Sequence, residues 1–418
     1  MLEGKKQAKK PRKPVVLRPK SELDCQHCVE EKGKKAKAEQ KKAIVAWSER
    51  KGRGGRRKGN STEGYFCPNA ECDYFGIRDE KIHALVWDGR HGKQEEIRDL
   101  KCQACRKKFT IRKNTVLYRL KTHSGMVEKI MWLLALGVDA SALEEVFGIR
   151  EITIRSWLWR SGVQGRKLHE QFMVELNLIH VQLDELWGNV KSDGQEVWLW
   201  AVTDVKTKLV PVLQLGGRTQ AMAYRVVHEL KERLRADCVP VFSTDGLRHY
   251  FYALTAHFGQ WELLEGEKPV WVLLSDFIYG QVIKHQKRRR TVEVERRMQV
   301  GEGKVYRERL KAAGLSGHIN TSFIERLNLT IRQNVSKLTR RTWGPTYYAS
   351  ELMEHLDWWR SYYHFVRYHE SLTMKLDQAV ERKGRRQPQR YRCRTPAMAA
   401  GLVTRRWSVK ELLSYPLL

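Results

Sequence analysis

Apolar residues between positions 126 and 160 recur at helical spacing in three short stretches. The first stretch ends at Gly137, and the second runs from Ser141 to Phe147 and is followed by Gly148. The third stretch, REITIRSWLWRSG, begins at Arg150. A short helix, a glycine and a polar-faced helix are typical of the helix-turn-helix motif. The pattern therefore predicts a helix-turn-helix domain over residues 119–168, with a plain helical hairpin as the alternative.

The third stretch also predicts which side chains face the interior of this domain. Ile152, Trp157 and Leu158 are the candidate core positions. The remaining polar side chains are then free to reach base edges and phosphates of DNA. These candidate DNA-binding residues are Arg150, Thr153, Arg155 and Ser156.

From residue 170 onward the apolar residues alternate or form short runs, which indicates β-strands. Residues 176–190 read as one strand, 196–217 as a hairpin, 219–236 as a helix, and 239–259 as a strand followed by a helix. Three strands, a helix and a fourth strand predict a mixed α/β sheet flanked by helices. We expect this core to span residues 169–345, with a basic insertion at about 262–320. Within the insertion, residues 269–276 read as a further strand, and the charged residues 284–310 as a loop or hairpin that grips DNA, with a solvated charged face as the alternative. A helical, basic extension over residues 346–418 should follow.

The segment Thr321–Gln333 predicts an amphipathic helix with an unusual flank. Glu325, Asn328 and Arg332 lie three and four residues apart, beside an apolar stripe. A carboxylate, an amide and a guanidinium on one flank suggest a metal ligand beside groups that hold a phosphate backbone. The alternative is a Glu–Arg pair on the surface of an ordinary helix. The stripe consists of Ile324, Leu327, Ile331, Val335 and Leu338.

The charge of the chain favours a polyanionic partner. The 418 residues include 78 Lys and Arg against 48 Asp and Glu, a net charge of +30, and nucleic acid is the partner that such a surface suits best. Residues 1–60 are basic, low in apolar residues and rich in Gly-Arg runs, which predicts a flexible DNA-binding arm or a solubilising or targeting tail. We find no 18-residue apolar run and no signal peptide, so we expect a soluble, intracellular protein that does not engage membranes.

Cysteine spacing predicts a zinc site within a small ribbon domain at residues 61–118. Cys67 and Cys72 form one close pair, and Cys102 and Cys105 form another. Two thiolate pairs on facing hairpins supply the four soft ligands of tetrahedral zinc. Two unrelated reduced pairs are the alternative. A third pair, Cys25 and Cys28, has no obvious partner, and its metal binding is left open.

Three acidic residues are candidate ligands for Mg²⁺ or Mn²⁺. Asp184 lies in the first strand, Asp245 follows a later strand, and Glu325 is on the C-terminal helix. Magnesium prefers hard oxygen donors, and two ions held by carboxylates can activate the attacking oxygen and stabilise the leaving oxygen in phosphodiester chemistry. Other acids could replace them: Glu185 for Asp184, Asp204 or Asp276 for Asp245, and Glu293, Glu295, Glu302 or Glu308 for Glu325.

These motifs, in this order, resemble the DDE transposases of bacterial insertion sequences, and most closely the family typified by insertion sequence one. The resemblance rests on LDELWGNV with EVWLWAVTD, on STDGLRHY, on IERLNLTIRQ with RRTWG, and on the cysteine-rich segment before the helix-turn-helix. It implies an RNase H-like fold, cleavage of transposon ends, and joining of the 3′-OH to target DNA. Asp184, Asp245 and Glu325 correspond to metal ligands, and Asn328 and Arg332 to DNA-contacting neighbours. It also implies a homodimer or higher oligomer, because two double-stranded DNA ends must be held together.

The chain departs from that family in two segments. The stretch between Asp245 and Glu325 is longer than the family's minimal core, and the basic arm before residue 60 is additional. The resemblance covers roughly residues 65–345. Two other functions stay open at this stage, namely a DNA-binding regulator without catalysis and an RNase H-like nuclease or resolvase that cuts but does not join. The resemblance also implies a cytoplasmic, nucleoid-associated protein of a prokaryote.

Overall fold

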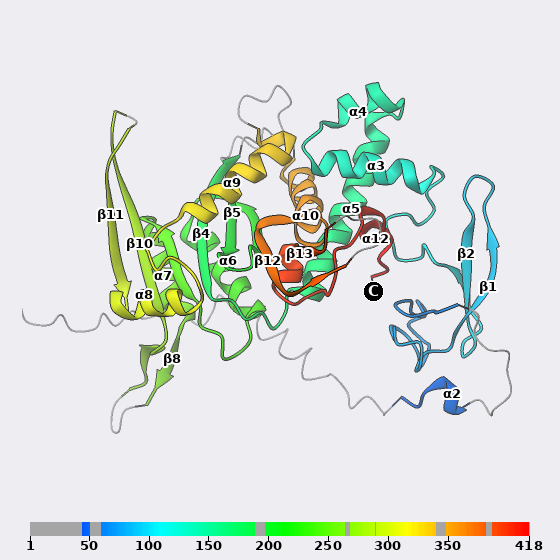
Figure 1. Cartoon of the computed structure of the whole chain (residues 1–418), viewed down its shortest axis with the longest axis horizontal. Coiled ribbons are helices and arrows are strands. Elements are labelled where there is room, and N and C mark those ends of the chain that lie inside the picture. The colour runs from blue at the N-terminus through cyan, green and yellow to red at the C-terminus, as the bar shows by residue number, and fades with distance from the viewer. Residues whose placement is uncertain are drawn as a thin grey trace, which may run out of the picture.

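A computed structural model describes most of the chain between residues 44 and 417 (Figure 1). The arm expected over residues 1–60 lies outside the described residues except for its last part, which includes the short helix α2 (Trp47–Arg50). Cys25 and Cys28 also lie outside them. The described residues are 44–50, 60–188, 197–263, 268–288, 290–339, 348–381 and 387–417.

The cysteine-rich segment folds around a three-stranded antiparallel sheet, β1 (Leu85–His91), β2 (Ile97–Cys102) and β3 (Lys108–Thr110). Its core is small, with Tyr74, Leu85 and Leu100 packed beside the cysteines. Trp47 of α2 stacks edge-on against Tyr74, with ring centroids 5.7 Å apart. So small a core gives little stability by itself, and such domains commonly depend on a metal or disulfides.

Three helices follow, namely α3 (Ser124–Ala135), α4 (Ala140–Phe147) and α5 (Glu151–Phe172). Asp139 caps α4 by accepting from the Ser141 N–H, and Gly148 ends it in the left-handed region, with φ of 65°. Ile154 and Trp157 of α5 are buried as core residues. The prediction that Ile152 belongs to the core is wrong, because this side chain is 71% exposed. Two residues along a helix correspond to a rotation of about 200°, so Ile152 and Ile154 face opposite ways.

A six-stranded mixed sheet forms the centre of the remaining chain, in the order β11-β10-β7-β4-β5-β6. β4 runs antiparallel to β5, and β5 antiparallel to β6, as the sequence predicted for a strand and hairpin. β7 and β10 add on the other side of β4, each parallel to its inner neighbour, and β11 closes that edge antiparallel to β10. The strands are β4 (His180–Gly188), β5 (Val197–Asp204), β6 (Val212–Gly216), β7 (Val241–Asp245), β10 (Ile278–Lys287) and β11 (Arg290–Val300).

Helices cover both faces of this sheet. On one face, α6 (Gln220–Arg233) and α7 (Arg248–His257) enclose a core with Leu183, Trp200 and Phe242 of the strands. On the other face, α9 (Ser322–Asn334) and α10 (Ala349–Phe365) pack on the neighbouring strand residues Leu199 and Ala201. The alternation of inward side chains along each strand places successive residues in these two cores.

The segment 262–320 differs from the basic insertion that the sequence suggested. It supplies β10 and β11, so two strands of the main sheet lie within it. It also holds β9 (Val270–Leu273), which pairs with β8 (Gly259–Glu262), and α8 (Gly303–Ala312), which packs against Val241 and Ile278. Figure 1 shows the β10–β11 hairpin extending well beyond the neighbouring strands. The hairpin that was one of two readings of residues 284–310 corresponds to β10 and β11, whereas the pairing of β10 with β7 was not predicted.

The C-terminal extension is not wholly helical. After α10 it forms an antiparallel pair, β12 (His369–Val380) and β13 (Gln389–Arg394), before the short helices α11 (Pro396–Ala399) and α12 (Val409–Ser414). A single turn of 3₁₀ helix, η2 (Ser336–Leu338), precedes α10. Within the described ranges, no helix is both long enough and apolar enough to cross a membrane.

Helix α10 joins the N-terminal helices to the sheet. Its Trp359 packs into the core beneath the sheet, whereas the adjacent Trp358 packs among α3, α5 and α12. Gly162 and Gly165 of α5 allow a close approach, since a Cβ at either position would lie within 2.8 Å of atoms of α10. Helix α10 therefore contributes to two neighbouring cores, one with α3, α5 and α12 and one with the sheet and α9.

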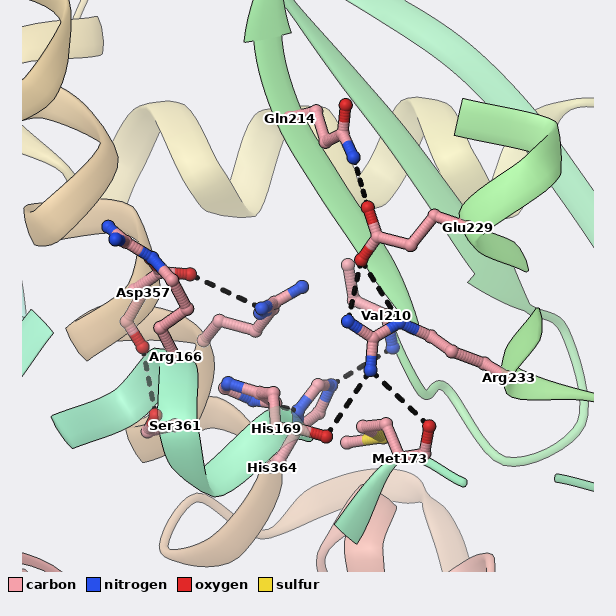
Figure 2. Close-up of polar contacts among 11 residues, drawn as sticks. Arg166, His169, Met173, Val210, Gln214, Glu229, Arg233, Asp357, Ser361 and His364 are labelled. Atoms are coloured by element: carbon pink, nitrogen blue, oxygen red, sulfur yellow. Dashed lines mark hydrogen bonds and ion pairs between the residues drawn. The ribbon is translucent and has the colours of Figure 1, made fainter. Parts of the chain in front are cut away.

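Two histidines lie buried where α5, α10 and the sheet meet (Figure 2). The Val210 N–H donates to His364 Nε2 at 2.9 Å, so His364 carries its proton on Nδ1 and donates to His169 Nε2 at 3.0 Å. Burial lowers the pKa of both imidazoles well below the usual range. The network holds both rings in their neutral forms.

We expect these histidines to make the fold acid-sensitive. Their pKa values are depressed in the folded state, so the unfolded chain takes up protons first as the pH falls. The free energy of unfolding is therefore unaffected above about pH 6.5 and decreases below it, by up to about 1.4 kcal/mol per pH unit for each ring. Lowering the pH from 7.5 to 5.5 should reduce the free energy of unfolding by about 2–3 kcal/mol for the two histidines together. Urea midpoints at the two pH values measure it. His364→Gln, whose Oε1 can still accept from Val210, should show a smaller loss, and an equal loss would contradict this role.

Candidate functional site

Asp184 and Asp245 lie side by side on two neighbouring strands. β4 and β7 run parallel, and their register pairs Leu183 with Thr244, the residues just before the two aspartates. The adjacent Glu185 joins them, and one carboxylate oxygen from each of the three acids lies within 4.8 Å of the others. Three carboxylates this close repel one another strongly, and such a cluster could bind a divalent metal ion.

The electrostatics of the cluster fit a cation site. Burial, followed by the neighbouring Asp245 and Glu185 carboxylates, raises the pKa of Asp184 to about 7. Burial also raises the pKa of Asp245 and of Glu185. A bound divalent cation would remove this penalty, because it offsets the mutual repulsion and replaces the lost hydration.

Glu325 of α9 lines the same pocket but stands apart from the three-carboxylate cluster. The open pocket has a volume of about 670 Å³ and includes Asp184, Asp245 and Glu325. Lys284 of β10 and the Thr321 hydroxyl both donate to Glu325 Oε1, at 2.5 and 2.6 Å. Both contacts fall on one oxygen, so Oε2 is left for a further ligand.

Glu185, the alternative to Asp184, is already engaged by protein groups. Its side chain is 2% exposed, Arg218 donates twice to Oε1, and the Tyr250 hydroxyl donates to Oε2 at 3.1 Å. Among the described residues, Asp184 accepts one side-chain hydrogen bond, from Asn328 at 2.8 Å. Of the two neighbours, Asp184 is therefore the one with oxygen sites to spare for a metal ion.

The other acids considered from the sequence lie elsewhere. Asp204 accepts from the Thr207 N–H and hydroxyl and from two further backbone N–H groups, so it stabilises the turn after β5. Asp276 is exposed between β9 and β10 and does not line the pocket. The four glutamates considered in place of Glu325 belong to β11 and to the start and middle of α8, and none lines the pocket either; these are Glu293, Glu295, Glu302 and Glu308.

The expected DNA-contacting residues of α9 have structural partners. Asn328 is buried and donates to Asp184, so it orients a carboxylate of the cluster. Arg332 donates to the carbonyls of Leu338 and Trp187, at 3.4 and 3.5 Å. The contacts of Asn328 and Arg332 with DNA stay predictions.

In the N-terminal helices, Arg150 is exposed at the start of α5, and Thr153 is half-buried one turn further on. Arg155 forms ion pairs with Glu151 and with Glu351 of α10, at 2.6 and 3.6 Å. Of the four expected DNA contacts, Arg150 and Ser156 are exposed, and Thr153 and Arg155 are half-buried. Arg155 would have to exchange its carboxylate partners for phosphate.

The four predicted zinc ligands converge. Cys67 Sγ lies 3.6 Å from Cys105 Sγ, and Cys72 Sγ lies 3.8 Å from Cys102 Sγ. A tetrahedral ion with Zn–S bonds of about 2.3 Å places its sulfurs about 3.8 Å apart, whereas a disulfide places them about 2 Å apart. All four Sγ atoms lie within 4.8 Å of one another, so this buried cluster could bind zinc.

No protein-family model and no curated protein matches this chain. Lys284 and Arg218 are among the residues of the carboxylate pocket that were missed from the sequence. Lys284 reaches the pocket because β10 pairs parallel with β7, with Val282 opposite Asp245. Arg218 lies in the loop before α6. Neither carries a local sequence signal, and only the strand pairing could have identified Lys284.

Proposed function

We propose that this protein is a Mg²⁺- or Mn²⁺-dependent DDE transposase with an RNase H-like core. It would bind double-stranded transposon ends, cleave DNA strands there and join the 3′-OH ends to target DNA. The observation that carries the proposal is the convergence of Asp184, Asp245 and Glu325 in one open pocket from two parallel strands and a helix. The mixed sheet with helices on both faces supports it, as does the net charge of +30. A homodimer or higher oligomer in a prokaryotic cytoplasm belongs to the same proposal.

The donor set suits magnesium chemistry. The two aspartates and Glu325 would hold the divalent ions, which when bound activate the attacking oxygen and stabilise the leaving oxygen of a phosphodiester. Asn328 holds Asp184 in place by donating to its Oδ2. Lys284, Arg218 and Arg248 add three positive charges around the pocket, and these favour the approach of a phosphate. Lys284 also donates to Glu325 Oε1, which leaves Oε2 of that carboxylate for a metal ion.

The proposed DNA-docking part comprises the cysteine-rich module and the helices α3 to α5. The order of α4, Gly148 and α5 fits a helix-turn-helix, and exposed Arg150 lies at the N-terminus of the candidate recognition helix. Because α5 continues into the interior shared with α10, DNA bound at this helix would be rigidly placed relative to the carboxylate pocket. Such rigidity helps to deliver one particular phosphodiester to the metal site.

Glu325→Gln should reduce DNA cleavage and joining by at least about 100-fold while leaving the fold intact. The amide keeps the size of the side chain but removes the charge needed to hold a metal ion, and a lost ligand commonly costs that much. The measurement is strand cleavage and strand transfer by purified protein with Mg²⁺ on duplexes carrying the element's own ends.

Glu185→Gln serves as the matched control. Glu185 lies in the same cluster but is bound by Arg218 and Tyr250, so we expect this variant to retain most of its activity. Full activity of Glu325→Gln together with inactivity of Glu185→Gln would reverse the two assignments. Cleavage without joining by the wild-type protein would support a nuclease instead.

A further inference from the structure

A second polar groove lies on the molecule at the edge strand β6, away from the carboxylate pocket. It has a volume of about 580 Å³, is bounded by α5, β6, α6 and α10, and shares no lining residue with that pocket. Four arginines and three carboxylates line it, together with Gln214 and the first residues of α10. The arginines are Arg166, Arg225, Arg233 and Arg360, and the carboxylates are Glu170, Glu229 and Asp357.

The inner carboxylates are already committed to arginines. Glu229 accepts from Arg233, which also donates to the carbonyls of His169 and Met173, as Figure 2 shows. Asp357 is shared, since Arg166 donates to its Oδ2 at 3.0 Å and Arg360 to its Oδ1 at 3.2 Å. One carboxylate therefore serves two guanidinium groups, and positive charge is left over beside it.

Arg360 has hydrogen-bond donors that a bound ligand could satisfy. Its side chain is 4% exposed, and within the described part of the chain its Nε and Nη1 atoms have no hydrogen-bond acceptor. A guanidinium buried with unmet donors is costly, by several kcal/mol in general, unless an acceptor is supplied. The exposed Arg225 on α6 faces the same groove and makes no ion pair with any described residue.

The mouth of the groove also favours an anion. Ala349 and Ser350 line it, and they are the first two residues of the 17-residue helix α10. Among the described residues no side chain caps this end, since Tyr348 at the N-cap position makes no capping hydrogen bond. Free N–H groups at a helix N-terminus attract phosphate, and arginine forks match its oxygens.

We propose that this groove binds a phosphate oxyanion, with Arg360 and Arg225 as its principal ligands. Phosphate chemistry fits better than a single carboxylate, because donors come from several elements and surround a volume large enough for a phosphate-bearing ligand. The source could be a free phosphate compound or the phosphodiester backbone of DNA, and both offer the same oxygens. The inference does not depend on the proposed catalytic function.

Calorimetric titration of the full-length protein with inorganic phosphate tests the proposal, with sodium chloride at equal ionic strength as the reference. We expect saturable binding that Arg225→Gln weakens roughly fivefold and Arg360→Met weakens tenfold or more. Lys231→Gln is the matched control, because Lys231 is on the same helix but lies over the Phe258 ring, and it should bind phosphate as the wild type does. Phosphate binding that is no stronger than chloride binding, or that Arg225→Gln leaves unchanged, overturns the proposal, even if Arg360→Met fails to fold.

Two further experiments identify the source of the phosphate and distinguish the groove from the carboxylate pocket. The first experiment adds an oligonucleotide without terminal phosphates and follows the ³¹P resonance of bound inorganic phosphate. Displacement of the phosphate would mean that the groove binds DNA. Retention of the phosphate would mean that the groove binds a small phosphate compound. Asp184→Asn should leave phosphate binding unchanged, because Asp184 does not line the groove. Loss of binding in that variant would place the phosphate in the carboxylate pocket and overturn the proposal, whereas inactive DNA chemistry with intact phosphate binding would affect the proposed function alone.

Discussion

Asp184→Asn should abolish DNA cleavage and joining, by at least about 1,000-fold. Asp184 is the carboxylate of the cluster that has oxygen sites to spare, and each 1.4 kcal/mol of lost transition-state stabilisation is about tenfold in rate. The same substitution should stabilise the protein when no Mg²⁺ is bound. The folded-state pKa of Asp184 is raised to about 7, so its ionisation lowers stability progressively as the pH rises from about 4 to 7. Asparagine carries no such charge.

The measurement pairs a strand-transfer assay with thermal unfolding at pH 8. We expect the variant to melt above the wild type without Mg²⁺ and to gain nothing from added Mg²⁺. The hydrogen bonding should survive, because Asn328 Oδ1 is buried without a partner among the described residues and could accept from the new amide. The buffer should contain no chelator, which would also strip an ion from the cysteine cluster. A destabilised variant whose melting temperature still rises with Mg²⁺ would contradict the assignment of Asp184 as a metal ligand.

The sequence predicted those parts of the fold whose signals are local. Alternating apolar residues identified the hairpin β5–β6, and the Cys67 and Cys102 pairs converge as their spacing implied. Asp184 and Asp245 could also be brought together from the sequence, because each marks a point on a recognisable strand. These features depend on a few neighbouring residues and on the side-chain period of two.

The pairing of strands that lie far apart along the chain could not be predicted from the sequence. β10 contains Lys284, His285 and Lys287 and reads as a charged segment, yet its first half pairs with β7 inside the sheet. Its buried half, from Ile278 to Val282, is short enough to be hidden by the polar half that follows. The missed strand is also why Lys284 was missed as the partner of Glu325.

The roles of polar side chains were harder to predict than their positions. Asn328 and Arg155 lie on the helices that the pattern predicted, but one is buried against Asp184 and the other is paired with Glu151 and Glu351. A helical pattern specifies a face to within about a third of a turn, and the partner on the facing element decides what the side chain does. That partner belongs to tertiary structure and leaves no mark in the local sequence.

Cys102→Ser should remove the bound zinc and unfold the cysteine-rich module while the α/β core stays folded. A structural zinc site contributes about 10–16 kcal/mol of binding free energy, and the three-stranded sheet here has too small a core to replace it. Serine is a poor zinc ligand and leaves three sulfurs. Metal analysis of the purified protein should fall from one zinc per chain to none, and limited proteolysis should then cut between residues 60 and 118.

Cys393→Ser provides the matched control, because Cys393 is an exposed cysteine on β13, far in sequence from the cluster. Its zinc content and proteolytic pattern should equal those of the wild type. Loss of the module should also weaken binding to transposon ends more than it weakens binding to unrelated DNA, since the remaining surface of a chain with net charge +30 still attracts any duplex. Zinc content that Cys102→Ser leaves unchanged would mean that the ion is held elsewhere, and the sulfur distances of 3.6 and 3.8 Å would then reflect packing alone.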